Sequence, residues 1–370
     1  MNCDSAGRFF GLICIVALAV TAAARADDAS NDRTIAEMTE IIAADQSNAA
    51  AFEKRGEAYY LKRDWNRALE DCSAAIRIDP NFGRAYHCRG RAHSAKGDRD
   101  HALADYNEAI RLDPAYGPSY TSRALEYYSK GDFDLAIAGF TEAIERNPKQ
   151  AYLAFIKRGE AYAEKRDSDH AVADYNEAMQ RNPAAALPYE LRSTIHFDKG
   201  EIDAALDDCN TAVRLEPGSA GGHYCRSVVL LKKGDTDNAI QELDDVARIM
   251  PSFEKAYLAR ALAWHRKGDD KRAIADYDEA IRLQPGNSTA YNNRASVFRD
   301  MGESDRALAD FNEAIRLDPG NQLALANRGI LYMKLSDAKR ARADFNSVLA
   351  LPPTDKWAVD TAREGLGFLK

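Results

Sequence analysis

Cysteines are the residues of this chain with the clearest capacity for chemistry. Cys72 and Cys88 lie 16 residues apart, and Cys209 and Cys225 repeat that spacing. Paired cysteines can form a disulfide, bind a metal ion or pack as buried free thiols. Because these four of the six cysteines, without Cys3 and Cys14 near the N-terminus, allow three disulfide connectivities, the spacing alone leaves the pairing open.

A metal site at the cysteines would need histidine ligands. His87 precedes Cys88 by one residue, whereas His223 precedes Cys225 by two, so the two offsets differ. Only three ligands would converge at either place, and a structural zinc ion is held by four. We therefore expect no metal site and no cofactor.

The histidines also match no known catalytic motif. The chain contains no H-E-x-x-H, no P-loop, no G-x-G-x-x-G after a strand and no G-x-S-x-G elbow. His93 and His196 align with positions that elsewhere carry Tyr or Trp, which predicts that they pack in the core. We expect this protein not to be an enzyme.

Arginine recurs so regularly that it indicates either anion binding or structural pairing. An acidic residue usually follows it 16 positions later, and buried charges are usually paired, so we favour a ladder of ion pairs along stacked helices. Arg123 is the exception, since Gly139 stands where its acidic partner would be. The arginines are Arg55, Arg89, Arg123, Arg158, Arg192, Arg226, Arg260, Arg294 and Arg328, and the acidic residues are Asp71, Asp105, Asp174, Asp208, Glu242, Asp276, Asp310 and Asp344.

A fixed period sets the elements that must position these side chains. Nine of the twelve prolines, from Pro80 to Pro353, follow one another at gaps of 34 residues, with a single gap of 35. Such a period demands a repeat architecture. Numbering each repeat from 1 to 34 with proline at position 32 gives nine repeats from Ala49 to Asp355, with Ala151 as the one extra residue.

Each repeat has the pattern of two helices. Positions 4 and 11 are mostly large and aromatic, position 8 is small, and the 4-8-11 spacing places all three on one helical face. Position 15 is often Gly, as in Gly97 and Gly131, which predicts a left-handed helix end. Position 20 is Ala in all nine repeats, and the proline at position 32 ends the second helix.

These positions resemble the tetratricopeptide repeat (TPR), whose pattern places aromatic, Leu-Gly, Tyr, Ala, Phe, Ala and Pro at the same offsets. The clearest departure is the Arg at position 7, where the family usually has Leu. The resemblance implies an all-α solenoid, a right-handed superhelix of antiparallel helix pairs. It also implies that the second helix of one repeat packs on the first helix of the next. We therefore predict the disulfides Cys72–Cys88 and Cys209–Cys225.

The segments outside the repeats have predicted roles as well. We expect a linker and capping helix at residues 27–48, with Met38 and Ile41 facing the first repeat, and a C-terminal capping helix at residues 356–370. The repeats between them occupy residues 49–82, 83–116, 117–150, 152–185, 186–219, 220–253, 254–287, 288–321 and 322–355.

The N-terminus has the pattern of a secretory signal peptide. Arg8 precedes an apolar run, and the small residues Ala24-Arg25-Ala26 complete an A-x-A end, so we expect residues 1–26 to be removed. The alternative is an uncleaved membrane anchor, although the run is shorter than the ~20 residues of a spanning helix. Export would place the protein in an oxidising compartment, a bacterial periplasm or the exterior.

The overall charge limits the partners. The formal net charge is -8, which is unlike a nucleic-acid-binding protein and provides no basic stripe for an anionic membrane. We therefore expect a protein or peptide partner, no nucleic acid, and no stable membrane insertion after signal cleavage. Self-association is also open.

The resemblance implies that first-helix positions 2, 5, 9, 12 and 13 line a concave groove that binds a peptide or a helix. With two asparagines from position 6, the candidates are Tyr60, Arg91, Thr121, Tyr128, Glu160, Glu190, Phe197, Tyr224, Lys255, His265, Asn292, Asn293, Arg299, Asn327 and Met333. Asn293 and Asn327 could hold a peptide backbone. The leading hypothesis is an exported scaffold in the assembly or maintenance of an envelope complex. The alternatives are a self-associating structural solenoid and a metal-binding or regulatory subunit of an enzyme.

Overall fold

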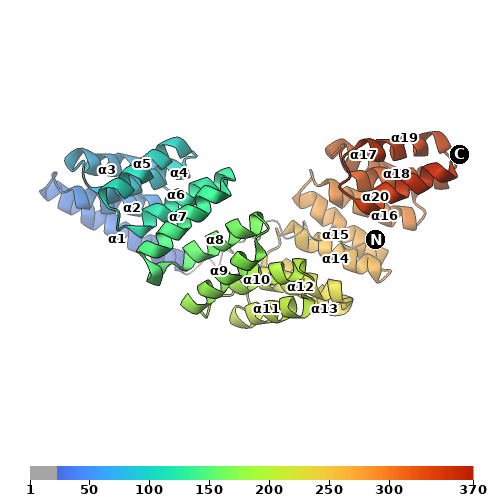
Figure 1. The fold of residues 1–370 in the computed structure, drawn as a ribbon, viewed down its shortest axis with the longest axis horizontal. Coiled ribbons are helices and arrows are strands. Elements are labelled where there is room, and N and C mark those ends of the chain that lie inside the picture. Colours follow the sequence, from blue (N-terminus) through green and yellow to red (C-terminus); the bar gives the residue numbers. More distant parts are fainter. Residues whose placement is uncertain (1–22, 370) are drawn as a thin grey trace. The chain divides into compact units, whose positions relative to one another are not determined.

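The computed structural model describes residues 23–369, and all its regular elements are helical (Figure 1). The predicted all-α TPR solenoid is therefore confirmed for the described residues, which contain no strand. The chain divides into two compact parts, here called the N-terminal half (residues 23–195) and the C-terminal half (residues 196–369). The predicted signal peptide lies mostly outside the described residues.

Twenty α-helices follow one another along residues 23–369. Each repeat contributes a first and a second helix, and α1 precedes the repeats. The first helices and the final helix are α2 Ala49–Leu61, α4 Gly83–Ala95, α6 Gly117–Lys130, α8 Tyr152–Glu164, α10 Leu187–Asp198, α12 Ala220–Lys233, α14 Glu254–Arg266, α16 Ser288–Asp300, α18 Gln322–Lys334 and α20 Lys356–Phe368. The others are α1 Ala23–Ala44, α3 Trp65–Ile78, α5 Arg99–Leu112, α7 Phe133–Arg146, α9 Ser168–Arg181, α11 Ile202–Leu215, α13 Thr236–Ile249, α15 Asp270–Leu283, α17 Ser304–Leu317 and α19 Ala338–Ala350, with a 3₁₀ turn η2 at Pro148–Gln150.

Local chemistry sets the helix ends. Asp64 caps α3 by accepting a hydrogen bond from the backbone N–H of Arg67, and Asp269 caps α15 in the same way. Gly131 ends α6 with φ of 83°, as the glycine pattern predicts. Arg63 and Arg166 take the same left-handed conformation without being glycine, with φ of 60° and 61°. Tertiary packing therefore imposes this turn where the sequence does not favour it.

The core is a repeated contact between position 8 and position 24. A Cβ atom added to Gly159 would lie 2.6 Å from the ring of Tyr175, and one added to Gly329 would lie 2.6 Å from the ring of Phe345. Both rings are almost completely buried. Position 8 is therefore small because the aromatic ring of the second helix lies directly on it.

Position 7 carries the ion-pair ladder. Arg294 donates from Nε and Nη2 to the carboxylate of Asp310 on α17, at 2.7 and 2.8 Å, while its Nη1 donates to Asp278 on α15. One guanidinium thus joins both helices of its repeat to the second helix of the preceding repeat. The same two-bond pairing occurs in Arg55–Asp71, Arg89–Asp105, Arg158–Asp174, Arg260–Asp276 and Arg328–Asp344.

Arg123 has a different partner. Its Nη2 donates to Glu142 at 2.8 Å and its Nη1 to Asn107 at 3.0 Å. The Nε of Arg123 is buried and has no hydrogen-bond partner within the described chain, and the same holds for Arg226. Repeats without Asp at position 23 therefore keep the charge pairing but lose one of its hydrogen bonds.

The capping helix at the N-terminal end of the repeats differs in one detail from the sequence prediction. Met38 and Ile42 of α1 are buried against Ala51, whereas Ile41 is exposed. Ile42 lies four residues after Met38 and so shares its face, while Ile41 points to the edge. At the other end, Ala358, Val359 and Ala362 of α20 pack on the last repeat.

The ladder yields a stability prediction. Asp310→Ala should lower the free energy of unfolding by about 3 kcal/mol, because it leaves the partly buried charge of Arg294 without its main partner. Glu313→Ala is the matched control, since Glu313 lies on the same helix and pairs with Arg316 at the surface. Urea titrations followed by circular dichroism measure both. Equal losses in the two variants would contradict a structural role for the ladder.

Candidate functional site

The first helices of successive repeats contact one another directly. In the N-terminal half α2, α4, α6 and α8 are neighbours in this order, and in the C-terminal half α12, α14, α16, α18 and α20 are neighbours. Within each half these helices present adjoining side chains on one surface, here called the first-helix surface. This is the surface on which the sequence places the candidate groove residues.

In the N-terminal half, Arg91 connects two first helices. Its guanidinium forms an ion pair with Glu57 of α2 and lies 4.0 Å from the centre of the Tyr60 ring. The Arg91 side chain is 25% exposed and that of Glu57 is 33% exposed, so both remain accessible. An aromatic ring beside paired charges can contact both apolar and polar groups of a peptide.

A buried histidine lies beside this group. The His87 ring on α4 shares a hydrogen bond of 3.1 Å with the Ser122 hydroxyl on α6 and meets the Tyr116 ring edge-on at 5.3 Å. Burial lowers the pKa of His87 to about 3, and the charge of Arg91 contributes to the lowering. His87 is therefore neutral at ordinary pH. Burial also raises the pKa of the neighbouring Glu53, with a further contribution from Glu57.

Three further candidates in this half are partly exposed. The hydroxyl of Thr121 donates to the Gly117 carbonyl, the Tyr128 ring meets Phe133, and Glu160 pairs with a lysine one turn earlier. The fourth, Glu190, is only 5% exposed. The surface of this half is thus a mixture of aromatic, hydroxyl and charged groups.

In the C-terminal half, three asparagines and one arginine form a chain of hydrogen bonds. Asn327 donates to Asn292 at 3.1 Å, Asn292 donates to Asn293 at 3.1 Å, and Arg299 donates to Asn327 at 2.9 Å. The sequence suggested that Asn293 and Asn327 could hold a peptide backbone. In the structure Asn327 bonds to Asn292, and both are buried, so much of their bonding capacity is used internally.

A histidine and two carboxylates lie near this chain of hydrogen bonds. His265 Nδ1 lies 2.7 Å from Asp270 and its Nε2 lies 3.5 Å from Asp300 on α16. Lys255 and Met333 are partly exposed. Phe197 is 8% exposed and Tyr224 is 2% exposed.

Five of the sequence candidates are therefore buried, namely Glu190, Phe197, Tyr224, Asn292 and Asn327. The other ten are partly exposed. A repeat position determines the face of the helix, but the size of the neighbouring side chains determines how much of that face stays accessible. The buried five support the surface, and the exposed ten can contact a ligand.

The structure brings the cysteines of each predicted pair together. Cys72 on α3 and Cys88 on α4 have Cα atoms 5.9 Å apart, and Cys209 on α11 and Cys225 on α12 have Cα atoms 5.7 Å apart. Both separations suit a disulfide, and the sulfur atoms lie at bonding distance. A Cβ atom on Gly56 would lie 2.7 Å from the Cys72 sulfur, so the small residue at position 8 leaves room for the pair.

The neighbouring histidines have other partners. His87 bonds to Ser122, and His223 bonds to Glu242 at 2.7 Å and to the Pro217 carbonyl at 3.0 Å. The hydrogen bond that His223 donates to the Glu242 carboxylate is the main cause that raises the pKa of His223.

One cluster was missed by the sequence analysis. His93, expected in the core, has a side chain that is 22% exposed and lies beside Asp98 and His101. The available signal was a second histidine eight residues later in the same repeat.

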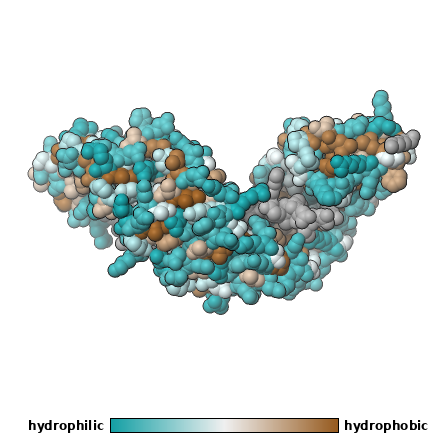
Figure 2. Space-filling view, viewed as in Figure 1, coloured by the Kyte–Doolittle hydropathy of each residue, from teal (hydrophilic) through white to brown (hydrophobic). Residues whose placement is uncertain are grey.

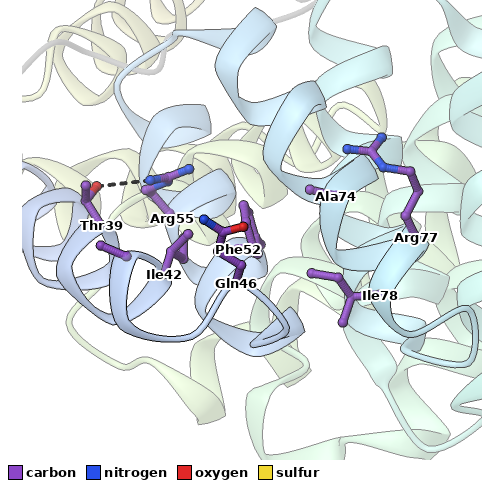
Figure 3. A pocket seen from close by; sticks show the side chains of 9 residues that line it. Thr39, Ile42, Gln46, Phe52, Arg55, Ala74, Arg77 and Ile78 are labelled. Atoms are coloured by element: carbon purple, nitrogen blue, oxygen red, sulfur yellow. Dashed lines mark hydrogen bonds between the residues drawn. The ribbon is translucent and has the colours of Figure 1, made fainter.

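A separate depression of about 510 Å³ lies near the N-terminal end of the described chain (Figure 3). It lies between α1, α2 and α3 and is lined by Ile42, Phe52, Ile78 and Arg77 among others. Arg55 donates to the Thr39 hydroxyl at 3.1 Å along its wall. The depression is open to solvent and contains no cluster of catalytic groups.

The face of the protein drawn in Figure 2 is mainly polar. Figure 2 shows a face that is largely hydrophilic, with hydrophobic residues in small groups. Within residues 23–369, none of the helices combines the length and the apolar character needed to cross a bilayer.

Comparison with known sequences identifies the family. Sequence models described as tetratricopeptide repeat match residues 83–116, residues 288–321, and residues 21–81, 121–186, 156–220, 190–253 and 226–288. The chain therefore belongs to the tetratricopeptide repeat family. A search of curated proteins found no significant match.

Solved structures share the fold at low sequence identity. A TPR protein from Parabacteroides merdae matches with a TM-score of 0.55 and 19% identity, over 68% of this chain and 98% of that chain. The APC/C hetero-tetramer Cut9–Hcn1 matches with a TM-score of 0.56 and 15% identity, over 86% and 76%. Yeast Tom70 matches with a TM-score of 0.51 and 14% identity, over 92% and 93%. These similarities establish the helical-repeat fold.

The buried His87 yields a pH prediction. Because its folded pKa lies below the ordinary value of about 6.5, the unfolded state binds the proton more readily. Stability should therefore fall as the pH drops from about 6.5 towards 3. His87→Gln should flatten this decline between pH 7 and pH 5 in thermal melts. Identical declines in the wild type and the His87 variant would contradict this assignment.

Proposed function

We propose that this protein is an exported TPR scaffold that binds another protein, as an extended peptide or a helix, on its first-helix surface. The observation that carries the proposal is the Tyr60–Arg91–Glu57 group, where accessible aromatic and charged side chains from two adjoining first helices lie together. TPR proteins bind proteins and peptides, and this surface has the mixed chemistry that such ligands require.

Binding rather than catalysis is the proposed role. Tetratricopeptide repeat proteins are generally non-enzymatic scaffolds, and the repeat accounts for residues 49–355. The charged groups that recur most often, the position-7 arginines, are used in the ladder.

Export and an envelope setting are a further part of the proposal. The N-terminal segment has the charge and apolar pattern of a signal peptide, and the two cysteine pairs suit an oxidising compartment. In the periplasm or outside the cell each disulfide would tie neighbouring repeats together and add about 3 kcal/mol of stability. A scaffold strengthened in this way suits the assembly or maintenance of an envelope complex.

Site-specific photo-crosslinking in the native cells tests the binding surface. A photoreactive amino acid at Thr121 or Lys255 should give a discrete adduct with one other protein, whereas the same residue at Glu279 or Glu313 on exposed second-helix faces should give none. Combining the Thr121 probe with Tyr60→Ala and Arg91→Ala should remove its adduct. Adducts that contain only this chain would instead indicate self-association, and equal adducts at all four positions would contradict a dedicated surface.

Peptide mapping of the native protein without reduction tests export. We expect a mature N-terminus at Asp27 and two linked peptides, Cys72–Cys88 and Cys209–Cys225. Free thiols or crossed pairs would reject the pairing. An intact N-terminus in the membrane fraction would favour the retained anchor.

A further inference from the structure

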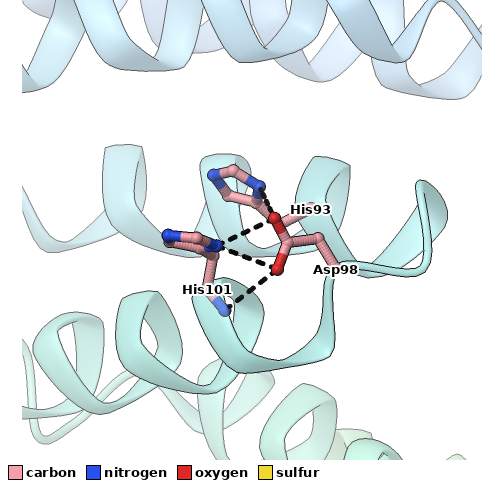
Figure 4. Close-up of side chains that lie close together, drawn as sticks. All are labelled: His93, Asp98 and His101. Atoms are coloured by element: carbon pink, nitrogen blue, oxygen red, sulfur yellow. Dashed lines mark hydrogen bonds and ion pairs between the residues drawn. The ribbon is translucent and has the colours of Figure 1, made fainter.

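Two histidines and an aspartate converge at the turn between α4 and α5. His93 lies in the last turn of α4, Asp98 caps the N-terminus of α5, and His101 lies in the first turn of α5. One ligand atom from each residue lies within 4.8 Å of the others. Figure 4 shows both imidazole rings beside the Asp98 carboxylate, whose oxygens interact with each of them.

The distances are close to those of a coordination sphere. His101 Nδ1 lies 2.8 Å from Asp98 Oδ2, and His93 Nδ1 lies 3.6 Å from the same atom. Atoms bound to one tetrahedral zinc ion at 2.0–2.1 Å are about 3.3 Å apart, and these two distances bracket that value. The His101 side chain is 72% exposed, so its ring has room to turn towards an ion.

Comparison of the repeats shows why, among residues 23–369, this is the one repeat with such a set. In four repeats an Arg at position 19 pairs with the acidic cap at position 16 and lies over the aromatic ring at position 11. These groups are Tyr59–Asp64–Arg67, Trp264–Asp269–Arg272, Phe298–Glu303–Arg306 and Tyr332–Asp337–Arg340. Positions 11, 16 and 19 thus pack together in the same way in these four repeats. There they offer one potential metal ligand, the carboxylate at position 16.

The fourth repeat provides an internal control. Its Tyr162, Asp167 and His170 copy the arrangement, with ring centroids 4.9 Å apart and an interplanar angle of 23°. The His93 and His101 rings stack in the same way, at 5.2 Å and 25°. The difference is that His93 replaces a tyrosine, which adds a second imidazole ligand.

The surroundings of His93 also favour its role as a metal ligand. Its Nε2 lies 4.0 Å from the carboxylate of Asp105, which Arg89 holds in place. A carboxylate near the distal nitrogen is a common neighbour of a metal-binding histidine, although 4.0 Å exceeds hydrogen-bond distance.

We propose that His93, Asp98 and His101 bind a divalent transition-metal ion, with water in the remaining coordination positions. Two imidazole nitrogens and one carboxylate oxygen suit Zn²⁺ and its neighbours better than Mg²⁺ or Ca²⁺. The site joins the two helices of one repeat, so the ion would fix the turn between them. The site is independent of the proposed binding surface.

Calorimetric titration of the purified full chain, without a histidine tag, with ZnCl₂ tests the site. The wild type should bind one Zn²⁺ that is lost, or weakened at least about 100-fold, in His93→Tyr and in His101→Arg. Both variants restore a side chain that another repeat carries at the same position, so both should fold. Tyr162→His should create a second Zn²⁺ site in the fourth repeat.

Two results would overturn the proposal. The first is a wild type that binds no Zn²⁺. The second is a Zn²⁺ isotherm that both substitutions leave unchanged, which would place the ion elsewhere. Circular dichroism of each variant separates loss of the ligand from loss of the fold.

Discussion

The ion pair between the arginine at position 7 and an acidic residue of the second helix is the interaction on which the rest of the structure depends. The guanidinium of this arginine is held between two helices of one repeat and the second helix of the repeat before it, as Arg294 is held between Asp310 and Asp278. A charged side chain that is mostly buried is stable only if it is paired with an opposite charge. The three helices must therefore keep the relative positions that allow this pairing. A leucine at this position would bury apolar area but would not specify that register.

This constraint determines what the first helices can present. Because the second helices are held by the ladder, the opposite face of each first helix is free to carry residues such as Tyr60 and Arg91 that vary from repeat to repeat. The proposed disulfides act at the same junction, since Cys72 and Cys88 join the second helix of one repeat to the first helix of the next. A rigid frame of this kind suits a binding protein, because less ordering is required when a ligand binds.

Much of this could be predicted from periodicity. The proline spacing and the alanine at position 20 predicted the helix pairs, and the resemblance to the tetratricopeptide repeat predicted which cysteines meet. Features that depend on the size of neighbouring side chains, or on a residue that departs from the repeat pattern, could not be predicted. Glu142 reaches Arg123 from outside the pattern, and Tyr224 is covered by its neighbours. His93 is partly exposed because its ring stacks at the rim of the turn and not in the core.

Hydrogen exchange of native Arg294→Met, followed by mass spectrometry, tests the ladder most directly. Methionine keeps much of the apolar stem but removes the guanidinium. The account predicts faster amide exchange in α15, α16 and α17 together, because one residue connects all three. Exchange that accelerates only within α16, or does not change, would show that the repeats are held in register by apolar packing and that the arginine ladder is incidental.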